Sequence, residues 1–310
     1  MRWLAVLALG GCGFSHGLLV ADARGDDTDA PARDAPADAP STCYEQWLSG
    51  TIAFEAAVAL TSVNSTGYDR DPFLTDNELT LYLSSPRTGT SGQTDVWVAT
   101  RTTIADPFST PIEASAFNST AVESKLSISA SGTIAVVGSN RPGSANIDVW
   151  ESIRATTADP WPAMNRTNVA MVDTGGNEHD PTLSADGQHL YLAPDDPSPQ
   201  HLVVATRGTD GRFGTPVPLL ELSGGGDADP SPTPDERILV FASSRSGAGD
   251  LWYATRVSAA AELGAPLAVP GVNTAAPEGD PHLSSDGCRL YFARNLGGDN
   301  WDLYVASAVR

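Results

Sequence analysis

An Asp-Pro motif recurs along this chain every fifty residues or so, and this spacing constrains the fold more than any other feature. Four segments carry it clearly: 71–83, 180–192, 229–241 and 280–292. A fifth segment, 125–137, has lost Asp-Pro but keeps the turn at Ser131-Gly132. Repeats of this length are typical of β-propellers, in which each repeat forms one blade. We therefore expect an all-β protein, a propeller of about five four-stranded blades.

The pattern within a repeat predicts where the strands lie. The first strand starts at Asp-Pro, a turn such as Asp186-Gly187 closes a hairpin, and the second strand alternates apolar residues. The third strand follows in segments such as 95–101, and the sequence ends just after the last of these. Segment 54–60 copies the fourth-strand pattern of 263–267. We expect this N-terminal segment to complete the last blade, which removes an exposed sheet edge.

The first twelve residues indicate export. Arg2 precedes an apolar stretch, 3–9, and Leu9-Gly10-Gly11-Cys12 follows at once. This tetrapeptide resembles the bacterial lipobox and predicts lipidation of Cys12; the alternative is an ordinary secretory signal with an incidental cysteine. Gly13 rather than Asp follows Cys12, which by resemblance to the bacterial sorting rule indicates the outer membrane. We expect a lipid-anchored protein of the bacterial cell envelope that faces the periplasm or the outside.

Composition sets the domain plan and excludes some partners. Residues 1–12 read as signal peptide and lipobox, 13–42 as a disordered Asp/Ala/Pro tether, and 43–310 as the propeller domain. The formal charge of −20 opposes nucleic acid and anionic lipid surfaces, so membrane contact is expected through the lipid anchor alone. We expect a monomer.

Taken together, these motifs resemble the WD-like propeller repeat of TolB-type proteins, many of which are bacterial envelope lipoproteins. The resemblance covers residues 44–310 and rests on the recurring pattern E-x-D-P, S-x-D-G, L-Y-F, S-x-R and D-[IVL]-[WY]-V-A-T-R. It implies a protein-interaction scaffold. The chain departs from the pattern at Lys125-Leu126, where Asp-Pro is lost, and at Ala193-Pro194-Asp195-Asp196, which replaces S-x-R.

Acidic residues form the candidate site. One lies two residues before the Asp-Pro position in every repeat, and with the motif aspartates they are expected around one mouth of the channel: Asp69, Asp71, Glu123, Glu178, Asp180, Asp227, Asp229, Glu278 and Asp280. The alternative role is structural, because four arginines are predicted on the same face and could pair with these carboxylates: Arg87, Arg141, Arg245 and Arg294. The five histidines show no zinc spacing and are expected to be solvated or in loops.

Two classes of function fit this pattern. The first is a non-catalytic binding or scaffolding module for an envelope protein or glycan. The alternative is a carbohydrate-active enzyme resembling glycoside hydrolases, which would use the carboxylates at the channel mouth. Catalytic residues should break the repeat, and these follow it. No catalytic residue is therefore assigned.

The third repeat and the cysteines give two further expectations. The third repeat lacks its arginine beside Glu178 and Asp180, so a calcium ion or a lysine-rich partner would fit there best. No cofactor other than this calcium ion is expected. With Cys12 lipidated, Cys43 and Cys288 are the remaining thiols, and the predicted topology places both on one face of the last blade. An oxidising compartment predicts a disulfide between them.

Overall fold

The computed structural model describes residues 42–309 apart from 90, 145, 167–168 and 196–198. The predicted signal peptide, the lipidation site Cys12 and the tether up to residue 41 lie outside the described residues. None of the described helices is long and apolar enough to cross a membrane.

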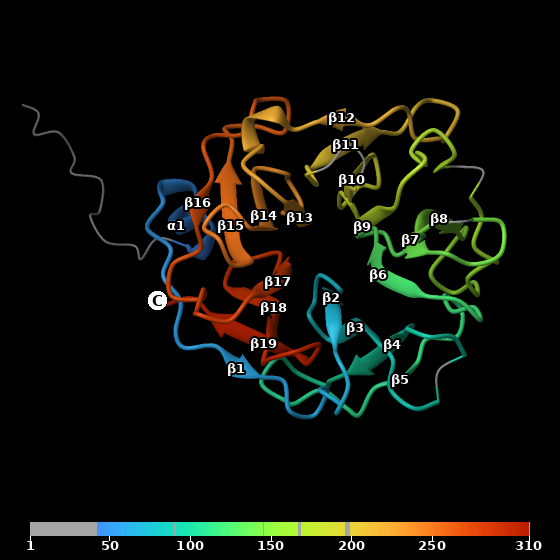
Figure 1. The fold of residues 1–310 in the computed structure, drawn as a ribbon, viewed down its shortest axis with the longest axis horizontal. Coiled ribbons are helices and arrows are strands. Elements are labelled where there is room, and N and C mark those ends of the chain that lie inside the picture. Colours follow the sequence, from blue (N-terminus) through green and yellow to red (C-terminus); the bar gives the residue numbers. More distant parts are fainter. Residues whose placement is uncertain (1–41, 90, 145, 167–168, 196–198, 310) are drawn as a thin grey trace, which may run out of the picture. The chain divides into compact units, whose positions relative to one another are not determined.

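The described residues of 42–309 form five antiparallel sheets arranged in a ring (Figure 1). The first blade contains the strands β2 (Arg70–Leu74), β3 (Thr80–Ser85), β4 (Asp95–Thr100) and β5 (Ile112–Glu113). The second contains β6 (Glu123–Ile128), β7 (Ile134–Ser139) and β8 (Asp148–Ile153). The third contains β9 (Glu178–Leu183), β10 (His189–Pro194), β11 (Val203–Thr206) and β12 (Val217–Pro218). The predicted all-β propeller of five blades is confirmed. The second blade has three strands among the described residues. A single β-bridge between Glu151 and Asn165 takes the place of the fourth strand that the other blades have.

The last two blades show how the ring closes. They contain β13 (Asp227–Pro232), β14 (Ile238–Ser243), β15 (Asp250–Thr255) and β16 (Leu267–Ala268), then β17 (Glu278–Leu283), β18 (Arg289–Asn295), β19 (Trp301–Ser307) and β1 (Val58–Ala59). Strand β1 pairs with β19, Val58 opposite Val305. The N-terminal segment therefore completes the fifth blade, as the repeat predicted.

A disulfide and a short helix hold this segment in place. Cys43 and Cys288 form the predicted bridge, with their Cα atoms 5.2 Å apart. Cys43 begins helix α1 (Cys43–Ser49), which the repeat gave no reason to expect and which Thr42 and Glu45 cap reciprocally. Trp47 is fully buried, and its indole N–H donates to the Gly287 carbonyl at 2.9 Å. The bridge, the helix and β1 together fasten the N-terminal segment to the fifth blade.

Apolar side chains fill the spaces between neighbouring blades. Val136 and Val149 of the second blade, for example, pack with Leu190 and Val203 of the third. Further clusters join the first blade to the second and the third to the fourth. The core is thus a set of interfaces between blades, and the repeated aromatic and aliphatic positions supply it.

The Asp-Pro position has an unusual backbone in every blade. The register between the first two strands shifts here, which marks a β-bulge. The residue at the bulge has a φ between 37° and 58°: Asp71, Lys125, Asp180, Asp229 and Asp280. Aspartate tolerates this left-handed conformation better than most residues, and a bulge redirects a side chain. The bulge therefore positions the residues of the channel ring described next.

Candidate functional site

Three of the motif aspartates link successive blades through the channel wall. The Asp71 carboxylate accepts the backbone N–H of Lys125 at 3.0 Å, Asp180 accepts that of Asp229 at 3.4 Å, and Asp229 accepts that of Asp280 at 2.9 Å. Each bond runs from one blade to the equivalent residue of the next. We call these five residues the channel ring.

Two cations lie among the carboxylates of the channel ring: Lys125, which is one of its five residues, and Arg70, which pairs with one of them. Asp280 pairs with Arg70 of the first blade, with Arg70 Nε 2.8 Å from its Oδ2. Lys125 stands where the other repeats have aspartate and is 2% exposed. Its Nζ has no hydrogen-bond partner among the described residues. The lost Asp-Pro of the second repeat therefore places a buried ammonium group among the carboxylates.

Burial and neighbouring charges give the four carboxylates of the channel ring different pKa values. Burial, reinforced by a neighbouring carboxylate, raises the pKa of Asp71 and of Asp180 to about 6. Burial and Asp180 also raise the pKa of Asp229 well above its ordinary value. Burial alone would raise the pKa of Asp280, but Arg70 outweighs it and lowers this pKa to about 2. Asp280 is therefore the most firmly ionised member of the ring.

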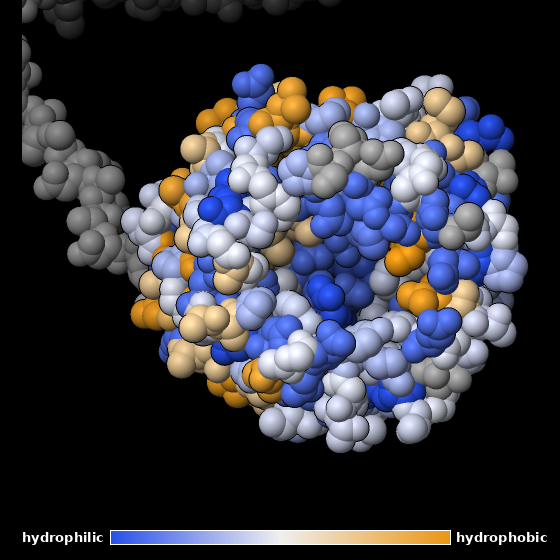
Figure 2. All heavy atoms as spheres, viewed as in Figure 1, coloured by the Kyte–Doolittle hydropathy of each residue, from blue (hydrophilic) through white to orange (hydrophobic). Residues whose placement is uncertain are grey.

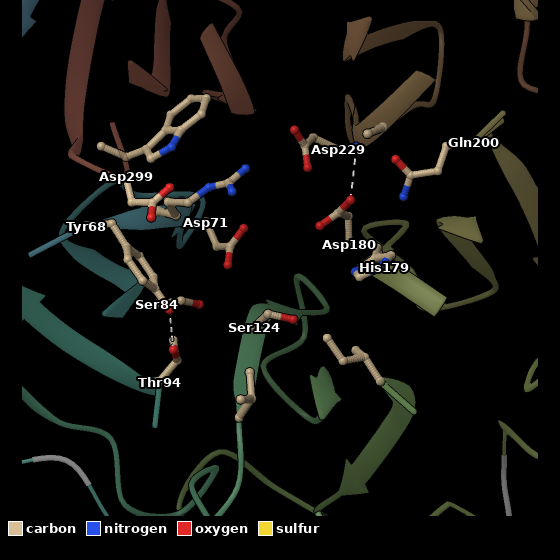
Figure 3. A pocket seen from close by; sticks show the side chains of 15 residues that line it. Tyr68, Asp71, Ser84, Thr94, Ser124, His179, Asp180, Gln200, Asp229 and Asp299 are labelled. Carbon is tan, nitrogen blue, oxygen red and sulfur yellow. Dashed lines mark hydrogen bonds between the residues drawn. The ribbon is translucent and has the colours of Figure 1, made fainter. Parts of the chain in front are cut away.

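A cavity of about 490 Å³ opens above the ring at one mouth of the channel. Figure 2 shows it as a hydrophilic hollow at the centre of the visible face. Asp71, Asp180 and Asp229 line it, and Figure 3 shows their carboxylates together with Ser124 around a shared space. The other lining residues include Tyr68, Arg70, Ser84, Thr94, Ser124, Ile147, His179, Gln200, Asp299 and Trp301.

Most of the lining comes from two positions of the repeat that vary from blade to blade. One position precedes the ring residue: Arg70, Ser124, His179, Ala228 and Gly279. The other lies at or just before the start of the third strand: Thr94, Ile147, Gln200, Gly249 and Trp301. Gly249 and Gly279 occupy these positions but lie outside the cavity lining. Sequence reasoning missed these residues because it searched for what recurs. These residues differ from repeat to repeat although each adjoins a position that is nearly the same in every repeat. That contrast is the signal that could have found them.

Several polar groups lie in the cavity wall. The Oγ atoms of Ser84 and Ser124 are buried and have no hydrogen-bond partner among the described residues. The Arg70 guanidinium lies 4.5 Å from the centre of the Trp301 ring. Burial lowers the pKa of His179, so its imidazole is neutral at pH 7. Of the described histidines, His201 lies in a connection as expected, whereas His179, His189 and His282 lie in strands and are partly exposed.

The other five predicted acidic residues lie away from the cavity lining and form an outer set. They are at most 1% exposed: Asp69, Glu123, Glu178, Asp227 and Glu278. Four pair with the predicted arginines: Arg87 with Asp69, Arg141 with Glu123 at 3.2 Å, Arg245 with Asp227 at 2.7 Å, and Arg294 with Glu278 at 2.7 Å. Each arginine also donates to a carbonyl in the connection from the preceding blade. The nine predicted acidic residues are thus divided between a channel ring and an outer set.

Glu178 has no such arginine. It lies near Asp148 and Asp173, and a carboxylate oxygen from each of the three lies within 4.8 Å of the others. Asp148 and Asp173 were absent from the sequence prediction: Asp148 lies thirty residues before Glu178, and Asp173, five residues before it, does not belong to the recurring acidic positions that were searched. The predicted gap in the third repeat is nevertheless present.

Comparison with known proteins identifies the fold. No protein-family model and no curated protein matches the sequence. Among solved structures, the catalytic domain of the GH62 α-L-arabinofuranosidase of Coprinopsis cinerea is 15% identical over 83% of this chain and 97% of its own, with a TM-score of 0.56. A family 117 glycoside hydrolase from Zobellia galactanivorans is 13% identical over 83% and 90%, with a TM-score of 0.51. TolB from Acinetobacter baumannii is 13% identical over 78% and 55%, with a TM-score of 0.44. At these identities the likeness concerns the fold alone, and the chain is a five-bladed β-propeller.

Proposed function

We propose that this protein is a non-catalytic binding propeller of the bacterial cell envelope, and that its channel mouth takes a basic side chain of a partner protein. The observation that carries the proposal is the excess of carboxylates around the cavity. The channel ring contains four carboxylates, Asp71, Asp180, Asp229 and Asp280, against the cations Arg70 and Lys125. A lysine or arginine side chain entering the cavity would offset part of this excess.

The variable residues would select the partner. The free hydroxyls of Ser84 and Ser124 can bond a polar group that enters the cavity. Tyr68 and Trp301 supply apolar surface for the methylene groups of a long basic side chain. A scaffold that keeps its ring constant and varies the residues above it is suited to recognising one particular partner.

One observation favours the enzyme alternative. Asp280 and Asp71 differ widely in pKa, as an acid and a base would. Oxygens of Asp71, Asp180 and Asp280, however, lie within 4.8 Å of one another, which is too close for the about 6.5–9.5 Å of an inverting pair and near the about 5–5.5 Å of a retaining pair, so the spacing argues against an inverting mechanism only. Asp71 also holds the N–H of the next blade, which is a repeated structural role. Incubation with arabinoxylan and agar oligosaccharides tests this alternative, and released sugar would overturn the binding proposal.

Calorimetry with defined peptides tests the proposal directly. Full-length protein in detergent is titrated with acetyl-Gly-Lys-Gly-amide, its arginine analogue and its glutamate analogue. We expect both basic peptides to bind and the glutamate peptide to give no heat. The Asp71→Asn variant should bind at least about tenfold more weakly. Asp76→Asn, in an exposed turn, is the matched control and should bind normally. Equal binding of the lysine and glutamate peptides would reject the proposal.

A further inference from the structure

The interface between the second and third blades, the blade 2–3 seam, departs from the repeat at two structural positions. The first position is the residue of a blade's second strand that stands opposite the outer-set carboxylate of its first strand. Ser139 stands opposite Glu123, Ser243 opposite Asp227, and Arg294 opposite Glu278, and each donates a hydrogen bond to that carboxylate. In the third blade Pro194 stands opposite Glu178 and has no donor to offer. Glu178 therefore lacks a hydrogen-bond donor that Glu123, Asp227 and Glu278 have.

The second departure is an asparagine replaced by aspartate. Asn64, Asn118 and Asn273 each accept a backbone N–H of a third strand and donate to the carbonyl of the same residue. Asp173 occupies this position in the blade 2–3 seam. A carboxylate has no N–H to donate. The substitution therefore adds a negative charge and removes a structural hydrogen bond at one step.

These departures leave a buried carboxylate cluster with unused oxygens. Glu178 is fully buried, and the side chains of Asp148 and Asp173 are 3% and 4% exposed. Arg166 bridges Asp148 and Asp173 at 2.7 Å each. Glu178 Oε1 accepts the backbone N–H of Thr174 at 3.0 Å. Glu178 Oε2 and Asp173 Oδ1 are buried and have no hydrogen-bond partner among the described residues.

We propose that Asp148, Asp173 and Glu178 bind a calcium ion in the blade 2–3 seam. When all three carboxylates are ionised, the single guanidinium of Arg166 leaves two negative charges, which one divalent cation would offset. Glu178 and Asp173, which carry the two unpartnered oxygens, belong to the group in which one carboxylate oxygen of each residue lies within 4.8 Å of the others. Hard carboxylate oxygens suit calcium, which also accepts irregular geometry and water as additional ligands. This site is separate from the channel mouth and does not depend on the proposed function.

The channel ring is a weaker candidate for the same ion. Oxygens of Asp71, Asp180 and Asp280 are also close together. There, however, Arg70 pairs with Asp280, the buried ammonium of Lys125 stands in the ring, and Asp71 and Asp180 accept backbone N–H groups. The cluster of Asp148, Asp173 and Glu178 has one paired cation, Arg166, for three carboxylates, and two of its oxygens have no hydrogen-bond partner among the described residues. It is therefore the site where a divalent ion would replace missing contacts.

Thermal unfolding of the full-length protein in detergent, treated with EDTA and then dialysed, tests the proposal. We expect a rise in Tm of about 5 °C at a calcium concentration about one hundred times Kd, and a smaller rise with magnesium. Asp173→Asn restores the residue found in three other seams, so it should fold. It should lose the calcium response, with a Kd at least about tenfold higher by calorimetry. No response of the unaltered protein at 5 mM calcium would overturn the proposal.

Three further variants locate the ion. Glu278→Gln changes the counterpart of Glu178 in a seam where an arginine pairs with it, and Asp71→Asn changes the channel ring. Both variants should keep the full calcium response. Pro194→Arg copies the arrangement of Arg294 opposite Glu278 and should reduce the response, because its guanidinium would compete with the ion for Glu178. A response that survives Asp173→Asn, or that disappears in Asp71→Asn, would place the ion elsewhere and overturn the assignment.

Discussion

The seam that closes the ring and the blade 2–3 seam are built from the same repeat but are stabilised differently. At the closing seam, between the fifth and first blades, Arg70 reaches across to Asp280 at 2.8 Å. Glu78 of the first blade pairs with Arg289 of the fifth and accepts from Tyr291 at 2.8 Å. The Cys43–Cys288 disulfide and strand β1 fix the fifth blade nearby. Both of these carboxylates, Asp280 and Glu78, are therefore paired with an arginine.

The blade 2–3 seam has an ion pair of its own and lacks another. Arg207 of the third blade pairs with Glu151 of the second. Glu178, however, lacks the arginine that Arg87 supplies to Asp69. The closing seam joins segments from opposite ends of the chain, so it depends on side-chain contacts. The blade 2–3 seam joins consecutive repeats, and covalent continuity allows it to lose an ion pair and keep an uncompensated carboxylate cluster.

The largest effect is expected from opening the covalent fastening of the fifth blade. The double change Cys43→Ser and Cys288→Ser removes a bridge between residues 245 apart in sequence. It should lower the free energy of unfolding by up to about 5 kcal/mol, measured by urea denaturation. The oxidised and reduced forms of the unaltered protein provide the control, since reductant should reproduce the loss. Equal unfolding midpoints would mean that β1 and α1 close the ring without the bridge.

The next prediction compares equivalent carboxylates in the two seams. Asp69→Asn at the closing seam leaves Arg87 without its carboxylate, and should lower the free energy of unfolding by about 3–5 kcal/mol. Glu178→Gln in EDTA should cost nothing or raise stability by about 1 kcal/mol, because it removes an uncompensated charge. Urea denaturation of both variants at pH 7.5 measures the difference. Losses of the same size would show that the two seams are equivalent after all.

The sequence was sufficient for the blades, for ring closure by 54–60 and for the disulfide, because all three follow from repeats kept in register. It could not separate the channel ring from the outer set. In a regular strand, Glu178 and Asp180 would share a face, since side chains alternate. The bulge between them and the rest of β9 gives Asp180 a φ of 58° and turns it into the channel. Bulges depend on pairing with the next strand, which the spacing of residues does not reveal.

The carboxylate cluster of the blade 2–3 seam was half visible in the sequence. The missing arginine indicated an uncompensated Glu178, but its partners come from β8 and from the connection before β9. Asp173 could have been found by aligning it with Asn64, Asn118 and Asn273. Asp148 could not, because an aspartate at the start of the third strand is an ordinary feature of this repeat: Asp95 and Asp250 occupy the same place.

The smallest predicted effect concerns pH and the first blade. Asp71 lies beside the closing seam, and burial together with Asp280 raises its pKa to about 6, although Arg70 and Lys125 oppose the rise. The ordinary value of 3.8 applies once the chain unfolds. The folded state therefore binds more protons between these values, and stability must fall as pH rises from about 4 to about 6. This contribution is up to about 3 kcal/mol.

The Asp71→Asn variant removes this titration but keeps an oxygen that can accept the Lys125 N–H. The free energy of unfolding of the unaltered protein should fall relative to that of the variant as pH rises through this window. Asp76→Asn, in an exposed turn, should follow the unaltered protein. Urea denaturation at half-unit steps from pH 4 to pH 7 measures the three curves. Parallel curves for Asp71→Asn and the unaltered protein would mean that the Asp71 carboxylate ionises normally and that Arg70 and Lys125 compensate the closing seam fully.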